Sequence, residues 1–494
     1  MTSSVQTRRR AAGPDAQGGA TSRPRGRWTG RRAALAAAVL LAAAAGPAAA
    51  QQRRPQTRPQ PRPQSRAQAG RIAYDSYTLP NGLTVVLSED HTVPVVTVDV
   101  WYHVGSANER MGRSGFAHLF EHMMFQGSAH VKKSEHMQFV ERAGGSMNGT
   151  TTEDRTNYFE TLPSNRLNLG LWLEADRMRS LAVTQGNLEN QRQTVEEERR
   201  LGVDNQPYGR AFEEGPTLPF DSATCFAYSH SVIGSMTDLD SARVEDVQAF
   251  FRQFYAPNNA VLAVVGDFDP AEVRQLVQRY YGDIPRAEAA APVTCQARYG
   301  SGARRFEMTD DKANLPLVAL LYRVPQKNDP DAPALDLLST ILAGGESSRL
   351  NLRLVRQEQA AMQAFGYTDL RRSAGLLMVA AVDNQGVAAS RVEQLLNEEV
   401  DKVRNDSIPQ AELTKAQNQY RAAVVRQRQT SMGVAEALQS ALWFDGSLED
   451  ANADVQRYLA VTTADLHRVA QRYLAPENRL TLVVNPPAQR QGGN

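Results

Sequence analysis

A weak internal repeat limits the folds open to this chain of 494 residues more than any other sequence feature. The segment Phe254–Asn259 (FYAPNN) precedes an apolar run, and Tyr473–Asn478 (YLAPEN) precedes a similar run. The helical patterns before both segments match at the same offset, and VPVV at 93–96 resembles LPLV at 315–318 at nearly that offset. Three matches at nearly one offset predict two copies of a domain of roughly 200 residues.

Both copies alternate helical periodicity with short apolar runs typical of strands. The first copy opens with the turn Leu79–Leu83 (LPNGL), and an Ala- and Pro-rich stretch near 287–292 separates the copies. We therefore expect an α+β fold of two homologous α/β-sandwich domains, at residues 72–287 and 296–486. Residues 487–494 are expected to form a disordered tail.

Residues 1–71 are expected to lie outside the folded part. Arg31 and Arg32 precede the apolar run 33–45, and Ala48–Ala50 offers small residues for cleavage. This layout is typical of a signal peptide, here residues 1–50, whose core is too short to span a membrane. Residues 51–71 are mostly Pro, Gln and Arg, which predicts a disordered linker. We expect an exported protein, periplasmic or secreted after cleavage near Ala50, with no transmembrane helix.

Charge and cysteine content argue against a nucleic-acid-binding protein and against a cysteine-based zinc site. The segment 1–71 carries 14 Lys and Arg but one Asp, which leaves 41 basic and 53 acidic side chains in the remainder. An acidic folded part disfavours nucleic acid as a partner. Two cysteines, Cys225 and Cys295, are too few for a cysteine-based zinc site. Export would allow them to pair, but two free thiols are an equally open alternative.

The segment His118–His122 (HLFEH) carries the strongest chemical signal. Histidines four residues apart share one face of a helix, which is the spacing with which a helix binds one zinc ion. Glu121 lies close enough to act on a metal-bound water. Ser114–Gly115 predicts the helix start and Gly127 its end. The helix surface is strongly apolar, so burying these polar groups without a metal would be costly. We interpret the segment as the metal site of a hydrolase.

A hydrolytic zinc site usually takes a third protein ligand, and no other histidine is clearly placed for it. The acidic run Glu196–Glu198 closes a predicted helix that begins near Asn187. On a helical wheel Glu198 falls about 60° from Val195, on the apolar stripe, whereas Glu196 lies about 100° and Glu197 about 160° away. This phase favours Glu198 as an interior carboxylate. Only the first copy can hold this site, because the second has no such motif.

With these residues the chain resembles the inverted zinc-motif (HxxEH) metallopeptidases, the pitrilysin and mitochondrial-processing-peptidase family (M16), and its two-domain bacterial exported type. The separation of Glu198 from His122 is close to the one between the motif and the glutamate ligand in that family. The resemblance covers nearly everything from 72 to 485. Its other segments are Leu79–Leu83, Gly144–Asn148 with Asp154 and Tyr158, Asp204–Gly209, Val232–Ser235, Pro257–Ala260 and Gly344–Leu350.

The resemblance implies a zinc metalloendopeptidase with a duplicated metallopeptidase fold, whose second domain is inactive. One zinc ion per chain would be bound by His118, His122 and Glu198, with Glu121 as the general base. The substrates would be peptides or unfolded polypeptide segments. The region of Asn148 would be an edge strand that pairs with an extended peptide.

Two departures from the family pattern concern the surroundings of the zinc. Gln191 stands where many members have a glutamate, which affects tuning of the site more than metal binding. Active members often carry an arginine and, seven residues later, a tyrosine that contacts substrate. Arg356 matches the arginine, but position 363 is Gln, and whether Tyr367 compensates stays open.

The second departure suggests that the substrate-binding pair comes from a second chain. We expect a homodimer or a heterodimer with a related zinc-free chain. The alternative function is a non-catalytic or partner-dependent subunit of the same fold, for assembly or peptide binding. The four intact motif residues favour the enzyme.

Overall fold

A computed structural model describes residues 70–295 and 302–487 of the chain. The expected signal peptide, nearly all of the expected linker 51–71 and residues 488–494 of the expected tail lie outside these ranges, so the expectations about them stay predictions. Within the described ranges, no helix has both the length and the apolar character needed to cross a membrane.

The described residues form two β-sheets. The first has the strand order β1-β2-β6-β3-β5-β4 and the second the order β7-β11-β8-β10-β9. The strands of the first sheet are β1 (Asp75–Thr78), β2 (Thr84–Glu89), β3 (Val95–Tyr102), β4 (Ser146–Thr151), β5 (Thr156–Pro163) and β6 (Ala260–Gly266). Those of the second are β7 (Arg304–Thr309), β8 (Leu317–Val324), β9 (Ala361–Leu370), β10 (Gly375–Asp383) and β11 (Arg479–Asn485).

The two sheets repeat one topology. Without β1, the order β2-β6-β3-β5-β4 matches β7-β11-β8-β10-β9 strand for strand. The pairs β2–β6 and β7–β11 are parallel, and the remaining neighbours in both sheets are antiparallel. The two proline segments of the repeat each form a short 3₁₀ turn, at Pro257–Asn259 and Pro476–Asn478, directly before β6 and β11. The predicted α+β fold with an internal duplication is therefore confirmed.

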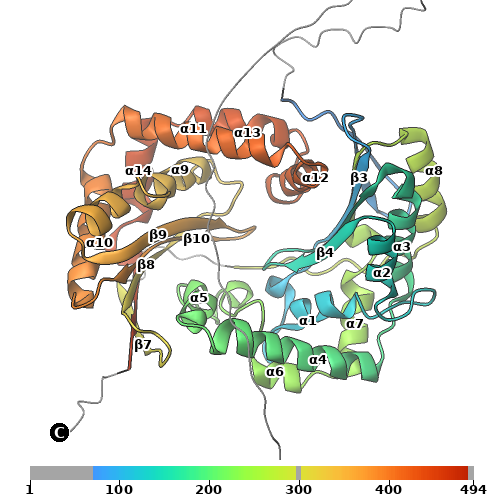
Figure 1. The fold of residues 1–494 in the computed structure, drawn as a ribbon, viewed down its shortest axis with the longest axis horizontal. Coiled ribbons are helices and arrows are strands. Elements are labelled where there is room, and N and C mark those ends of the chain that lie inside the picture. Colours follow the sequence, from blue (N-terminus) through green and yellow to red (C-terminus); the bar gives the residue numbers. More distant parts are fainter. Residues whose placement is uncertain (1–69, 296–301, 488–494) are drawn as a thin grey trace, which may run out of the picture. The chain divides into compact units, whose positions relative to one another are not determined.

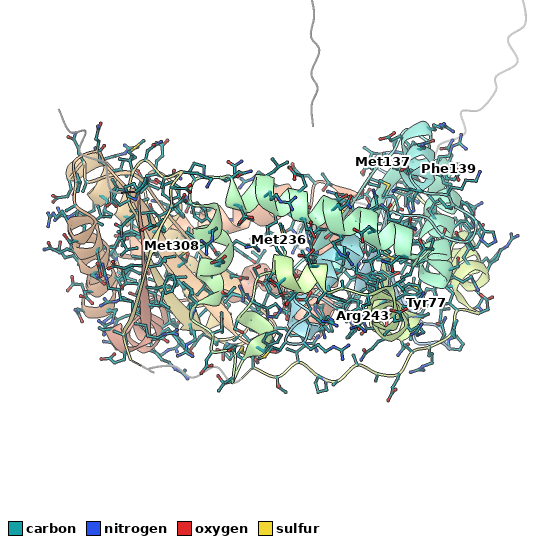
Figure 2. The ribbon with its side chains drawn as sticks, turned by 90° about the horizontal axis from the view of Figure 1, so that it is seen from below. Tyr77, Met137, Phe139, Met236, Arg243 and Met308 are labelled. Atoms are coloured by element: carbon teal, nitrogen blue, oxygen red, sulfur yellow. A yellow bond between two sulfur atoms is a disulfide. The ribbon has the colours of Figure 1, made fainter. Side chains whose placement is uncertain are left out.

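Helices cover one face of each sheet (Figure 1). The core of the first half joins the sheet to α1, α3, α4, α7 and α8, and that of the second half joins the sheet to α9, α10, α11 and α14. Figure 2 shows Phe139 and Met137 of α2 among the outer side chains of the first half, where Phe139 packs against Trp172 of α3. The helices are α1 (Phe116–Met123), α2 (Glu135–Arg142), α3 (Leu167–Ser180), α4 (Gln185–Arg199), α5 (Gly209–Glu214), α6 (Met236–Asp240), α7 (Val244–Phe254), α8 (Pro270–Tyr281), α9 (Ala332–Ala343), α10 (Ala389–Asn405), α11 (Gln410–Gln427), α12 (Ser431–Ser440), α13 (Asp450–Leu459) and α14 (Thr463–Tyr473).

The opposite faces of the sheets are covered by an exchange of helices between the halves. Ala435 and Leu438 of α12, from the second half, pack on β2 and β6 of the first sheet. Ala211 of α5, from the first half, packs on β8, β10 and β11 of the second. Strands with helices on both faces need apolar side chains at every position, which is why β6 (AVLAVVG) is buried throughout. Each half thus completes the hydrophobic core of the other.

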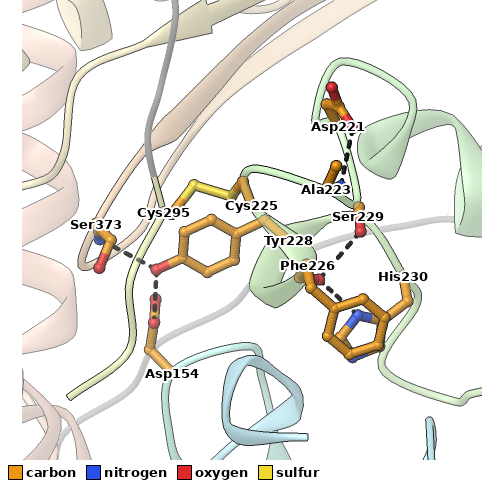
Figure 3. The surroundings of a disulfide bond; sticks show 10 residues. All are labelled: Asp154, Asp221, Ala223, Cys225, Phe226, Tyr228, Ser229, His230, Cys295 and Ser373. Carbon is orange, nitrogen blue, oxygen red and sulfur yellow. Dashed lines mark hydrogen bonds between the residues drawn. A yellow bond between two sulfur atoms is a disulfide. The ribbon is translucent and has the colours of Figure 1, made fainter. Parts of the chain in front are cut away.

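A disulfide joins Cys225 to Cys295, with a Cα–Cα distance of 4.2 Å (Figure 3). It ties the segment that connects the halves to the start of the short 3₁₀ helix Phe226–Tyr228. Of the two alternatives that the sequence left open, the structure therefore contains the paired cysteines.

Candidate metal centre

Helix α1 presents His118 and His122 on one side. The helix begins at Phe116 with Gly115 as its N-cap, at a φ of 84°, a left-handed conformation that favours glycine. The predicted start is confirmed. The helix ends at Met123, and Gly127, the predicted stop, lies four residues further on, at a φ of 100°.

A buried carboxylate holds the start of α1. Glu109 accepts hydrogen bonds from Gly115 N at 2.9 Å and Ala117 N at 2.7 Å, and His230 Nε2 lies 3.1 Å from the same side chain. The carboxylate satisfies backbone donors that the first turn of a helix leaves free. Sequence reasoning missed Glu109, because it lies outside the helix, six residues before the cap. An acidic residue shortly before a predicted helix start was the only available signal.

The structure brings His118, His122 and Glu198 together. Glu198 Oε2 lies 3.2 Å from His122 Nε2 and 3.8 Å from His118 Nε2. Each of the three side chains offers one potential ligand atom, and these three atoms all lie within 4.8 Å of one another. Three donors bound tetrahedrally to one zinc ion at about 2.0–2.1 Å would lie about 3.4 Å from one another. Donor types and spacing therefore fit a zinc ion.

Glu198 lies near the end of α4, and its side chain is 48% exposed. Leu188, Gln191 and Val195 of the predicted stripe are buried, but Glu196, which the wheel placed off the stripe, is only 14% exposed. The expected interior position of Glu198 is therefore wrong as a statement about burial. A helical wheel gives direction only and does not show where along its length a helix leaves the core.

The protonation of these side chains suits a metal ligand set. Burial, reinforced by the neighbouring His122, lowers the pKa of His118 to about 4, so its ring is neutral at neutral pH. The hydrogen bond with His122 lowers the pKa of Glu198, which favours the carboxylate. Neutral imidazole and ionised carboxylate are the forms that bind zinc.

Glu121 is partly buried beside the cluster. Burial raises the pKa of Glu121, although a hydrogen bond from Thr151 and the nearby His122 act in the opposite direction. The Thr151 hydroxyl donates to Glu121 Oε2 at 2.6 Å and so fixes one oxygen of the carboxylate. Sequence reasoning missed Thr151, because a run of threonines after Gly149 reads only as a strand.

Asn148 lies exposed on β4, which is the edge strand of the first sheet next to α1. At Gly149 the strand passes so close to its neighbours that a Cβ there would lie 3.0 Å from Tyr158 and 3.2 Å from Phe125, which follows α1. A glycine at this position lets the end of α1 approach the edge strand.

The residues expected to contact substrate from the second half do not join the cluster of potential ligands. Arg356 donates to Glu346 at 2.8 Å, within its own half. Gln363 and Tyr367 are both exposed on β9, the edge strand of the second sheet. Gln363 pairs with Val382 of β10, and Tyr367 pairs with Met378. Residues four apart on a regular strand point to the same side of the sheet, so Gln363 and Tyr367 share one face.

The other departure from the family pattern, Gln191, lies in the first half. It is buried in α4, where its amide nitrogen donates to Asn190 at 2.7 Å. Its hydrogen bond therefore stays within its own helix.

A second group of potential ligands, His136, Glu160 and Glu174, is buried in the first half. Arg177 pairs with Glu174 and lies 3.9 Å from Glu160, while His136 Nε2 lies 2.8 Å from Glu160. The guanidinium already supplies the positive charge that a cation would bring. The group is therefore best described as a buried ion network.

The chain is similar to known proteins over most of its length. The family model described as "Insulinase (Peptidase family M16)" matches residues 84–212, and "Peptidase M16 inactive domain" matches residues 241–420. Zinc protease PqqE of Helicobacter pylori is 31% identical over 417 residues, which span 84% of this chain and 93% of that protein. The probable mitochondrial-processing peptidase subunit beta of Arabidopsis thaliana is 24% identical over 426 residues, which span 83% of this chain and 78% of that protein. Among solved structures, a protease from Helicobacter pylori matches with a TM-score of 0.80 and 31% identity, over 84% of this chain and 100% of that one.

Proposed function

Because the chain belongs to the M16 peptidase family, we propose that it is a zinc-dependent endopeptidase that hydrolyses peptides or unfolded polypeptide segments. The observation that carries the proposal is the convergence of His118 Nε2 and His122 Nε2 on Glu198 Oε2, with Glu121 beside them. The three side chains would hold one zinc ion per chain. When bound, the ion supplies Lewis-acid chemistry, polarising the substrate carbonyl and activating a water molecule.

The residues of the chain would perform the proton transfers. Glu121 takes a proton from the attacking water and passes it to the leaving amine. A raised pKa helps it to hold that proton between the two transfers. Thr151 donates a hydrogen bond to one carboxylate oxygen of Glu121 and so limits rotation of the Glu121 side chain. The other carboxylate oxygen then points away from Thr151.

The edge strand β4 would hold the substrate. An extended peptide that pairs with β4 is recognised through backbone hydrogen bonds, which gives affinity with loose side-chain specificity. Asn148 lies exposed on this strand. A peptide bound there would lie next to α1, because Thr151 at the end of β4 contacts Glu121. Folded proteins have few free extended segments, so short or unfolded substrates fit this binding mode.

Exchange of Glu121 for Gln tests the chemistry. The variant should keep zinc, measured by elemental analysis, and lose cleavage of a peptide library, because the amide cannot accept the proton. Glu197→Gln, at a 56% exposed neighbour of the ligand Glu198, is the matched control and should cleave normally. Cleavage by the wild-type protein should stop with a chelator. Equal cleavage by wild type and Glu121→Gln would contradict the mechanism and favour a non-catalytic, peptide-binding or assembly subunit.

We further propose that the active form is a homodimer or a heterodimer with a related zinc-free chain, and that the protein is exported. The support for a partner chain is that Gln363 replaces the expected tyrosine, while Tyr367 lies exposed four residues later on the same face of β9. If the partner is a related zinc-free chain, activity of the purified chain should rise when that chain is added. Full activity of a chain that light scattering shows to be monomeric would exclude the need for a partner and would leave the proposed role of Glu121 unchanged. Cell fractionation tests the export.

A further inference from the structure

The β4–β5 turn (residues 152–155) connects the metal centre to the rest of the first half. Ser106 N donates to Thr152 O at 3.2 Å and Ala107 N donates to Glu153 O at 2.8 Å. The two segments are so close that a Cβ on Gly105 would lie 2.2 Å from Thr152 O. The segment that contacts the turn leads directly to Glu109, the carboxylate that caps α1. The turn and the start of the motif helix are therefore fixed to each other.

The same turn continues from the residue that orients Glu121. Thr151 is the last residue of β4, and its hydroxyl donates to Glu121 Oε2 at 2.6 Å. Because β4 is the edge strand, β5 is its only strand neighbour among the residues that the structure describes. The position of Thr151 thus depends strongly on what fixes the turn that follows it.

Asp154 in the turn is anchored to the second half. It is 6% exposed. Its Oδ1 accepts the Tyr228 hydroxyl hydrogen at 2.8 Å, and its Oδ2 accepts from Arg372 N at 2.9 Å. The Tyr228 hydroxyl in turn accepts from Ser373 N at 3.0 Å (Figure 3). One fully buried phenol therefore bridges the turn and the segment that follows β9.

Two further side chains of the second half contact the turn. The guanidinium of Arg371 pairs with Glu153 Oε1 at 2.8 Å, and Trp443 Nε1 donates to Asp154 O at 3.1 Å. The Arg371 side chain is 3% exposed and that of Glu153 22%, so the pair is only partly accessible to water. The end of one edge strand, β4, is thus clamped to the end of the other, β9.

We propose that Tyr228 and Asp154 are positioning residues through which the second half sets the orientation of Glu121, by way of Thr151. The inference rests on the proposed role of Glu121 as the base. A displacement of about 1 Å at a reacting group can lower a rate by as much as 100-fold, so a small shift of β4 is enough. The second half, which lacks a metal motif, then contributes to the catalytic geometry of the first.

Tyr228→Phe tests the proposal, because it removes the bridging hydroxyl and keeps the ring. We expect kcat about tenfold lower, with KM within about twofold and zinc content unchanged. Tyr473→Phe is the matched control: Tyr473 is 1% exposed and its hydroxyl donates to Asp331 Oδ2 at 2.9 Å, within the second half. The control should keep kcat. Wild-type kcat in Tyr228→Phe, or an equal loss in both variants, would overturn the inference.

Combination with Thr151→Val separates positioning from general loosening. Thr151→Val removes the hydrogen bond to Glu121, and Thr151→Ser should restore most of the activity. If Tyr228 acts through Thr151, adding Tyr228→Phe to Thr151→Val should lower kcat by less than about twofold more. Multiplicative losses would overturn the proposed route. Should Tyr228→Phe fail to fold, Asp154→Asn replaces it in the same cycle. Inactivity of Glu121→Gln alongside an unaffected Tyr228→Phe would leave the proposed function standing and remove only this inference.

Discussion

The Cys225–Cys295 disulfide should contribute substantially to stability. It closes a segment of the chain with a sequence separation of 70 residues. Loop-closure entropy lost from the unfolded chain for a loop of that length corresponds to about 4.4 kcal/mol at 25 °C, and measured values typically fall at about 2–4 kcal/mol. The double variant Cys225→Ser/Cys295→Ser should therefore unfold at a lower urea concentration and a lower temperature than the wild type.

The assay is urea unfolding followed by tryptophan fluorescence, with and without a thiol reductant. Reductant should shift the wild-type midpoint towards that of the double variant and leave the double variant unchanged. The single variants Cys225→Ser and Cys295→Ser serve as controls, since each removes the bond with one substitution, and both should match the double variant. Identical midpoints for oxidised wild type and double variant would refute the entropy argument.

The remaining predictions concern the metal centre and the pH dependence of stability. Substitution of a residue that only hydrogen-bonds a zinc ligand typically weakens zinc binding by roughly 10- to 100-fold. Glu198→Gln, which changes a proposed ligand itself, should weaken it by more, whereas Glu197→Gln should bind zinc like the wild type. Competition with a chelator measures both affinities. Burial lowers the pKa of His103 to about 3, against 6.5 when unfolded. As pH falls, His103 therefore takes up a proton in the unfolded chain before it does so in the folded protein. The stability that the neutral, buried His103 contributes is complete above about pH 6.5 and is lost as pH falls towards 3. Between pH 6.5 and 5 the loss is at most about 2 kcal/mol. His103→Phe, which keeps an aromatic ring against Trp443, should flatten this part of the curve, and parallel curves for both proteins would contradict it.

The repeat and the strands were predictable because their signals are local. Apolar runs bounded by turn residues indicated β6 and β11, and the shared proline segments showed that the two strands are equivalent. The motif helix was predictable for the same reason: its start at Gly115 and the spacing of its histidines depend on a few neighbouring residues. Glu198 was singled out by spacing and helical phase, although its exposure was not foreseen.

Sequence alone therefore determined that the chain is a duplicated α+β protein with one potential metal site, in its first half. Tertiary structure decided that Cys225 pairs with Cys295, that α5 and α12 are exchanged between the halves, and that Glu109 and Thr151 hold the motif helix and Glu121. It also showed that the second half clamps the end of β4 through Asp154. The physical reason is that periodicity and turns act over a few neighbouring residues, whereas these contacts join separate elements: Thr151 and Glu121 meet only when β4 packs beside α1, and Asp154 meets Arg372 only when the two halves have packed together.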